Sequence, residues 1–288
     1  MTEALPICLL DGEFIATDEA RVSPLDRGFL FGDGIYEVVP CYGGTPLRLD
    51  AHLARLAASL DALGIENPYT DARWREIVAT LIGKNGGGNL GVYLEITRGT
   101  EAGRDFLPQP DTRPTIFGFA WKLAPPAPEK LAHGIAAAVL EDIRWLRCDV
   151  KSVSLLGPVM LRMEARERGA DEAILARDGH LAEGSSSAVF IVRKDAIATP
   201  PASRERLPSI TRQVVGDTIA ALELPLEECE IAVGELAAAD EIWVASATRE
   251  VLAVTSLDGS HVGNGEPGPL WHRVYDEFQA LKQRECGA

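Results

Sequence analysis

A proline-rich stretch, Ala124-Pro-Pro-Ala-Pro128, is the feature that most constrains how this chain can fold. Consecutive prolines fix the backbone, remove amide donors and end secondary structure. The stretch predicts a linker at residues 123–129 between a small N-terminal α/β domain, residues 1–122, and a larger C-terminal domain, residues 130–288. The length of 288 residues fits one large domain or two of ordinary size.

Hydrophobic periodicity places strands and helices in both halves. Leucines recur at three- and four-residue steps along residues 49–63, which predicts a helix with one apolar face. Asp11-Gly12 between two apolar runs predicts a hairpin over residues 5–17, and residues 26–34 read as a glycine-rich loop. Further helices are expected at 70–84, 155–168, 210–222 and 268–284, and strands at 35–41, 91–97, 114–121, 134–140, 172–176, 188–192, 226–232, 241–245 and 251–256. Because the order lacks a strict βαβ rhythm, the expected fold class is α/β with mixed sheets in two domains.

Composition excludes several classes of protein. A hydrophobic fraction of 46% supports a real core, and a formal charge of −15 argues against nucleic-acid or anionic-membrane partners. No apolar run approaches the roughly 18 residues of a membrane span, and the N-terminus lacks a secretory pattern. Five scattered cysteines without CxxC, and histidines without HExxH, predict neither a disulfide framework nor a metal site. We therefore expect a cytoplasmic protein.

One lysine lies in an unusual setting. Lys151 follows an extended run with two arginines and a tryptophan, and precedes Ser-Val-Ser-Leu-Leu-Gly157, which turns into an apolar helix. A lysine pinned from both sides and partly desolvated can lose its proton, and a neutral amine can attack an aldehyde. Without further sequence support, the same lysine would be read as an exposed surface residue.

Further support comes from a resemblance that starts at this stretch, Glu141–Gly157. It recurs at Asp26-Arg-Gly-Phe-Leu-Phe-Gly-Asp-Gly-Ile-Tyr-Glu-Val-Val39, at Thr97-Arg-Gly-Thr100, at Glu183-Gly-Ser-Ser-Ser187 and at Ser209-Ile-Thr-Arg212. Taken in their order along the chain, the five segments span nearly the whole sequence. They resemble the fold-type IV pyridoxal-phosphate enzymes, most closely bacterial D-amino acid aminotransferases. Branched-chain aminotransferases and 4-amino-4-deoxychorismate lyases belong to the same family.

The resemblance implies pyridoxal 5'-phosphate, held in a cleft between the two domains, with the C-terminal domain as its main binding domain. Lys151 is then the Schiff-base residue and proton shuttle, Glu183 the partner of the pyridine nitrogen, and Arg55 the phosphate arginine. Ile210 and Thr211 open a predicted helix, where unpaired N–H groups favour an anion. The remaining implied coenzyme residues are Ser209, Leu207, Ser246, Ala247 and Thr248. The resemblance also implies that Arg144, Trp145 and Arg147 line the coenzyme side. It does not indicate which of the two arginines points inward.

The substrate side departs from the family pattern. Tyr36 matches a tyrosine near the substrate carboxylate, but the loop after Thr100 has Gly103 and Asp105 where D-amino acid aminotransferases carry Arg-x-His. An aspartate there repels a carboxylate. Three arginines are candidates to replace the lost contacts: Arg27, Arg98 and Arg104.

The expected function is therefore a pyridoxal-phosphate aminotransferase that moves an amino group between a D-amino acid, such as D-alanine or D-glutamate, and a 2-oxo acid. Transfer from branched-chain L-amino acids or R-amines is the nearest alternative because the loop is altered. An aminodeoxychorismate lyase is a second alternative, and a non-catalytic binding protein is a third. The resemblance also implies a homodimer, since the family completes its site across a subunit interface.

Overall fold

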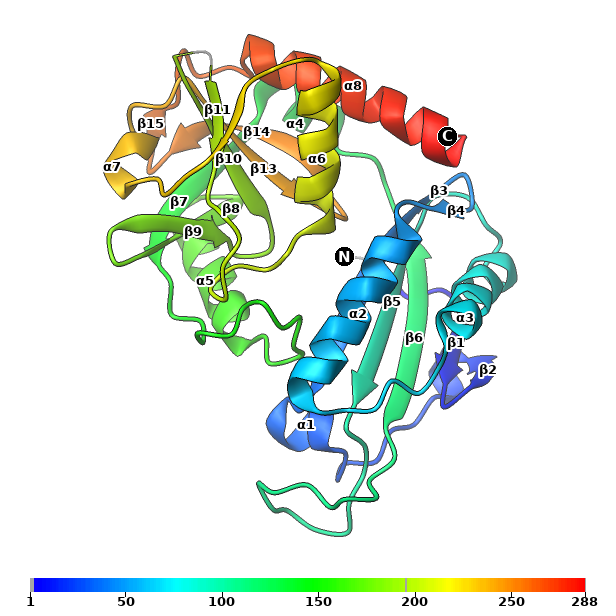
Figure 1. The fold of residues 1–288 in the computed structure, drawn as a ribbon. Coiled ribbons are helices and arrows are strands. Elements are labelled where there is room, and N and C mark those ends of the chain that lie inside the picture. The colour runs from blue at the N-terminus through cyan, green and yellow to red at the C-terminus, as the bar shows by residue number, and fades with distance from the viewer. Residues whose placement is uncertain (1–2, 195, 288) are drawn as a thin grey trace. The chain divides into compact units, whose positions relative to one another are not determined.

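The computed structural model describes residues 3–194 and 196–287 and is drawn in Figure 1. The chain divides into two compact units. Unit 1 comprises Met1–Ala124, Val150–Leu155 and Arg284–Ala288, and unit 2 comprises Pro125–Asp149 and Leu156–Gln283. The segment that carries Lys151 thus lies with the N-terminal elements. The division into domains joined at residues 123–129 stays a prediction.

Unit 1 contains an antiparallel sheet of six strands in the order β2-β1-β6-β5-β3-β4. The strands are β1 (Ile7–Leu10), β2 (Glu13–Ala16), β3 (Gly34–Tyr42), β4 (Thr45–Pro46), β5 (Leu90–Thr97) and β6 (Thr115–Lys122). The helices are η1 (Thr17–Glu19), α1 (Arg27–Phe31), α2 (Leu49–Leu63) and α3 (Asp71–Lys84). Helices α2 and α3 bury their apolar faces against the sheet, with Leu56 of α2, Ile77 of α3 and Val92 of β5 in one core cluster.

Unit 2 contains a mixed sheet in the order β12-β11-β10-β13-β14-β7-β8-β9, with β15 paired to β14. Its strands are β7 (Ile135–Glu141), β8 (Glu172–Arg177), β9 (His180–Gly184), β10 (Ala188–Arg193), β11 (Ala196–Thr199), β12 (Leu226–Glu228), β13 (Glu241–Ser246), β14 (Glu250–Leu257) and β15 (Ser260–His261). The pairs β14–β7, β7–β8 and β11–β12 are parallel. The helices are α4 (Pro128–His133), α5 (Leu156–Glu167), α6 (Ile210–Ala221), α7 (Val233–Leu236) and α8 (Pro269–Cys286). The expected α/β fold class, with a sheet and helices in both halves of the chain, is confirmed, but only the sheet of unit 2 is mixed, because every strand pair of unit 1 is antiparallel.

Several local predictions are confirmed and others are wrong. Helix α2 has the predicted bounds, and the Asp11-Gly12 hairpin forms with positive φ at both residues. The glycine-rich stretch 26–34 is not all loop, because Asp26 caps α1 by accepting from the N–H of Gly28. The strand predicted at 226–232 ends at Glu228. Residues 3–194 and 196–287 contain no helix with the length and apolar content of a membrane span.

Candidate active site

Lys151 lies in a segment that adds to the edge of β3 within unit 1. Its N–H donates to Ser59 Oγ of α2 at 3.2 Å, and its carbonyl accepts from the N–H of Tyr36 at 2.9 Å. One residue further on, Ser152 forms an isolated antiparallel bridge with Ile35. The Lys151 Nζ atom lies 4.2 Å from the centre of the Tyr36 ring. The backbone is therefore pinned on both sides of the lysine, and the amine contacts the tyrosine predicted for the substrate side.

A buried polar cluster of unit 1 surrounds Glu37, the residue after Tyr36. Glu37 accepts from Arg55 through two atoms, Nε at 2.7 Å and Nη2 at 2.8 Å, and from His52 Nδ1 at 2.9 Å. All three residues are buried. Burial alone would raise the pKa of Glu37, but the charge and hydrogen bonds of Arg55 and His52 outweigh it and lower the pKa to about 2. The guanidinium of Arg55 is consequently fixed in place by an ionised carboxylate.

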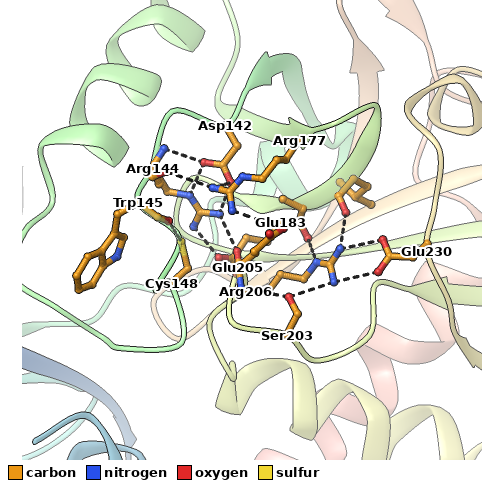
Figure 2. A network of polar contacts seen from close by, with 12 residues as sticks. Asp142, Arg144, Trp145, Cys148, Arg177, Glu183, Ser203, Glu205, Arg206 and Glu230 are labelled. Atoms are coloured by element: carbon orange, nitrogen blue, oxygen red, sulfur yellow. Dashed lines mark hydrogen bonds and ion pairs between the residues drawn. The ribbon is translucent and has the colours of Figure 1, made fainter. Parts of the chain in front are cut away.

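Glu183 is the centre of a second buried cluster, in unit 2 (Figure 2). Its Oε1 atom accepts from Arg144 Nη1 at 2.6 Å, and the N–H of Leu207 lies 3.2 Å from both carboxylate oxygens. Burial raises the pKa of Glu183, and Arg144 and the Leu207 N–H oppose this rise without cancelling it. Among the described residues, Oε2 has no donor besides the shared Leu207 N–H.

Arg144 is shared between two carboxylates. Besides Glu183, it binds Asp142 through Nε at 2.8 Å and Nη2 at 2.9 Å, and Arg177 also pairs with Asp142 at 2.9 Å. Arg147 instead pairs with Asp149 at 3.0 Å, with 39% of its side chain exposed. Of the two arginines that the sequence left undecided, Arg144 therefore points into the buried cluster and Arg147 does not.

The predicted phosphate-side residues lie at loop and helix ends of unit 2. Ser209 caps α6, accepting from the N–H of Arg212 at 3.1 Å, so Ile210 and Thr211 form the first turn of this helix. The hydroxyl of Ser246 is buried and has no hydrogen-bond partner among the described residues. Ala247 and Thr248 follow it in the turn between β13 and β14. A helix N-terminus and an orphaned hydroxyl both suit a phosphate.

Glu172 is a fully buried carboxylate that contacts the turn after Glu183 and the residue after Thr248. Glu172 of β8 accepts from Ser185 Oγ at 2.5 Å and from Ser187 Oγ at 3.2 Å, and it pairs with Arg249. Ser185 and Ser187 belong to the turn after Glu183, and Arg249 follows Thr248. Glu172 therefore braces both predicted coenzyme turns.

The three arginines predicted for the substrate carboxylate have different surroundings in unit 1. Arg98 donates to Asp33 and to the carbonyls of Leu63 and Gly64. Arg27 is 3% exposed and donates only to groups of its own chain among the described residues. Arg104 is exposed, and its guanidinium carbon lies 5.0 Å from the Phe31 ring centre. Of the three, Arg104 is the arginine presented to solvent.

Comparison with known proteins decides the family. A family model described as amino-transferase class IV matches residues 34–257. The chain belongs to this family. A D-alanine aminotransferase from Bacillus licheniformis is 38% identical over 271 residues, covering 94% of this chain and 95% of the relative. The recognition of an aminotransferase of fold type IV from the sequence is thereby confirmed.

Solved structures agree on the fold. A branched-chain aminotransferase from Thermoproteus uzoniensis, solved with norvaline, has a TM-score of 0.88 at 26% identity and covers 99% of this chain and 96% of its own. A fold IV transaminase from Curtobacterium pusillum has a TM-score of 0.80 at 28% identity, with 94% and 91% covered. Both match this class IV aminotransferase over nearly its whole length.

Sequence reasoning missed four buried polar residues of these clusters: Glu37, His52, Asp142 and Glu172. A glutamate inside an otherwise apolar strand is costly unless it is paired, which was a usable signal for Glu37. His52 precedes Arg55 by three residues and so lies on the same helix face. Asp142 precedes Arg144 by two residues in irregular backbone, where spacing gives no comparable signal.

Proposed function

We propose that this aminotransferase uses pyridoxal 5'-phosphate to move an amino group between a D-amino acid, such as D-alanine or D-glutamate, and a 2-oxo acid. The observation that carries the choice of donor is the likeness to D-alanine aminotransferases, at 34–38% identity over almost the whole chain. When bound, the coenzyme supplies an aldehyde and an electron-withdrawing ring, which together make the Cα–H bond of an amino acid acidic.

The donor set around Glu183 fits the pyridine ring. The positive charge of Arg144 is divided between Glu183 and Asp142, so the Glu183 carboxylate keeps acceptor capacity at Oε2. A protonated ring nitrogen is a cationic donor of the kind that this carboxylate lacks. We assign Glu183 to hold that proton, and Leu207, whose N–H holds Glu183, to pack against the ring.

The phosphate is assigned to Arg55, to the first turn of α6 and to the turn Ser246–Thr248. Arg55 offers a guanidinium fixed by Glu37, and arginine matches phosphate oxygens in planar, paired hydrogen bonds. Ser209, Ile210 and Thr211 offer the N-terminus of α6. The turn Ser246–Thr248 offers the Ser246 hydroxyl, which has no partner within residues 3–194 and 196–287. These groups supply both a cation and neutral donors for a dianion.

Lys151 is assigned two tasks. Its amine would hold the coenzyme covalently, and as a free amine it would move the proton at the substrate Cα. The hydrogen bonds to Ser59 and Tyr36 support this role because they fix the backbone from which the amine projects. Tyr36 and Arg104 are assigned to the substrate side.

A homodimer also belongs to this proposal. Unit 1 exposes Phe29 at 76%, Phe106 at 77% and Leu107 at 77%, and unit 2 exposes Leu146 at 64% and Leu156 at 72%. Contiguous exposed apolar surface is typical of interaction sites, and these side chains are the candidates for it. Sedimentation equilibrium of the purified protein tests this assignment. The expected cytoplasmic location stays a prediction, and cell fractionation would test it.

A coupled assay tests the choice of donor. Purified enzyme with coenzyme and 2-oxoglutarate is given D-alanine, L-leucine or an R-amine, and formation of the oxo product is followed. We expect turnover with D-alanine. Turnover with L-leucine alone, or with the amine alone, would contradict the proposal and favour the alternative raised by Gly103 and Asp105. Pyruvate release from aminodeoxychorismate without amino transfer would indicate the lyase instead.

A further inference from the structure

We propose that Arg27 is a positioning residue for loop 99–113 rather than a ligand of the substrate, and that it sets substrate affinity by holding Arg104 in place. The inference rests on the proposed function, because it assigns Arg104 to the substrate carboxylate. Loop 99–113 has 15 residues and lies within the connection between β5 and β6. It contains no helix and no strand. Loops of this length inside compact units are commonly functional.

The guanidinium of Arg27 is occupied by its own chain. Its Nε donates to Asp33 at 2.9 Å, Nη1 donates to the carbonyl of Asp105 at 2.8 Å, and Nη2 donates to the carbonyl of Phe106 at 2.9 Å. Nη1 also pairs with Glu101 at 3.2 Å. A guanidinium has five N–H donors, so four contacts to protein oxygens leave almost no capacity for a substrate.

Glu101 extends the same contact to the far side of the loop. Its Oε2 atom binds Arg27, while Oε1 accepts from the N–H of Gln109 at 2.8 Å and from Thr112 Oγ1 at 2.8 Å. The Arg27–Glu101 pair therefore connects residues near the start, the middle and the end of the loop. Most other loop side chains are exposed, so this pair is its main anchor.

The base of the loop is closed by backbone contacts that only glycine permits. The N–H of Arg27 donates to the carbonyl of Gly99 at 2.8 Å. Gly99 has a φ of +111°, and a Cβ atom there would lie 1.8 Å from the carbonyl oxygen of Arg113. Arg27 thus meets the loop through both its backbone and its side chain.

Of the two exposed arginines in the loop, Arg104 lies next to the anchored Asp105 and Arg113 lies at the end of the loop. The Arg104 guanidinium carbon lies 5.0 Å from the Phe31 ring centre and 5.3 Å from the Phe106 ring centre. Phe31 also lies under Arg27, at 4.8 Å. Stacking on ring faces leaves the N–H edges of a guanidinium available, and those edges match a carboxylate. Because Arg27 holds the carbonyls of Asp105 and Phe106, it also fixes the backbone that carries the Phe106 ring, against which Arg104 stacks.

Kinetics of Arg27→Lys in the coenzyme-loaded enzyme tests this role. Lysine keeps the charge but cannot reach Asp33, Glu101 and two carbonyls together. We expect KM for D-alanine to rise about tenfold or more, since small displacements of a positioning group are costly, with kcat and the coenzyme absorption band nearly unchanged. Amides of residues 99–113 should exchange hydrogen faster. Glu101→Gln should act in the same direction, and it serves if Arg27→Lys does not fold. Arg73→Lys, at an exposed ion pair of α3, is the matched control.

A double variant separates positioning from general damage. In an Arg104→Ala background, Arg27→Lys should raise KM little further, because the group it positions is gone. The inference is overturned if Arg27→Lys has the same KM as Arg73→Lys, or if its effect persists in full without Arg104. If the wild type itself shows no coenzyme band or no amino transfer, the proposed function fails and this inference with it.

Discussion

Glu37 in unit 1 and Glu183 in unit 2 are both buried beside an arginine, but the pKa values of the two carboxylates shift in opposite directions. In unit 1, Arg55 and His52 outweigh burial and lower the pKa of Glu37 to about 2. In unit 2, burial raises the pKa of Glu183, and the charge of Asp142 adds to that rise. The difference follows from how the arginines are shared: Arg55 gives two donors to Glu37, whereas Arg144 gives two to Asp142 and one to Glu183.

Only one of these two carboxylates can accept a hydrogen bond directly from a ligand. The carboxylate oxygens of Glu37 already accept hydrogen bonds from Arg55 and His52. Glu37 therefore affects a ligand only indirectly, by fixing the position of Arg55. Glu183 is buried but incompletely neutralised, which makes it the better acceptor for a cationic N–H from outside the chain. A saturated ion pair suits the phosphate side of a coenzyme site, and an unsaturated carboxylate suits the pyridine side.

The largest expected effect is on catalysis by Glu183→Gln. A glutamine cannot hold a proton on the ring nitrogen, so we expect kcat to fall by about 100-fold or more, a loss typical of removing one electrostatic contact. Coenzyme should still bind, as judged by its absorption band. Glu230→Gln, at the rim of the same network, provides the matched control. Near-normal kcat in Glu183→Gln would remove the ring-nitrogen assignment.

Glu37→Gln should mainly affect stability and coenzyme affinity. Leaving Arg55 buried without its carboxylate should lower the free energy of unfolding of the coenzyme-free protein by about 3 kcal/mol. The dissociation constant for pyridoxal phosphate should also rise, because Arg55 loses its anchor. Urea unfolding and a coenzyme titration measure the two effects. Glu76→Gln, in an exposed pair on α3, should change neither.

The same variant gives a pH test with a defined sign. Because the pKa of Glu37 falls from about 4.5 to about 2 on folding, its contribution is complete above pH 4.5 and is lost as the pH drops toward 2. The stability difference between wild type and Glu37→Gln should therefore shrink across this window. A difference that stays constant from pH 5 to pH 3 would show that the carboxylate charge is not responsible.

Asp142→Asn should have the smallest of these effects. Removing this like charge frees Arg144 to neutralise Glu183, so the pKa of Glu183 should fall. The acid limb of the kcat profile, where Glu183 gains its proton, should then move to lower pH by about one pH unit. Asp149→Asn, which removes the partner of the exposed Arg147, should leave that limb in place. An unmoved limb in Asp142→Asn would show that Asp142 does not tune Glu183.

Structural features that depend on neighbouring residues were predicted correctly from the sequence. The leucine spacing of α2 and the Asp11-Gly12 turn are properties of neighbouring residues, and both formed as expected. The five motifs identified the family because they keep their order along the chain. Helix α1 was missed because its five residues are too few for periodicity. Strand β12 ended early because its pairing with β11 stops at Thr199–Glu228.

The candidate site was less predictable where partners come from distant elements. The choice between Arg144 and Arg147 depends on Glu183, 39 residues away from Arg144. The Arg27–Glu101 contact joins residues 74 positions apart. Sequence spacing alone cannot indicate such pairs, whereas Glu37 and His52 offered local signals, a charge in an apolar strand and a shared helix face.

Chemical trapping identifies the lysine that binds the coenzyme. The coenzyme-loaded enzyme is reduced with borohydride and digested, and the modified peptide is located by mass spectrometry. The account predicts a phosphopyridoxyl group on Lys151 and its loss in Lys151→Ala. An active enzyme that carries the group on another lysine, or on none, would contradict it.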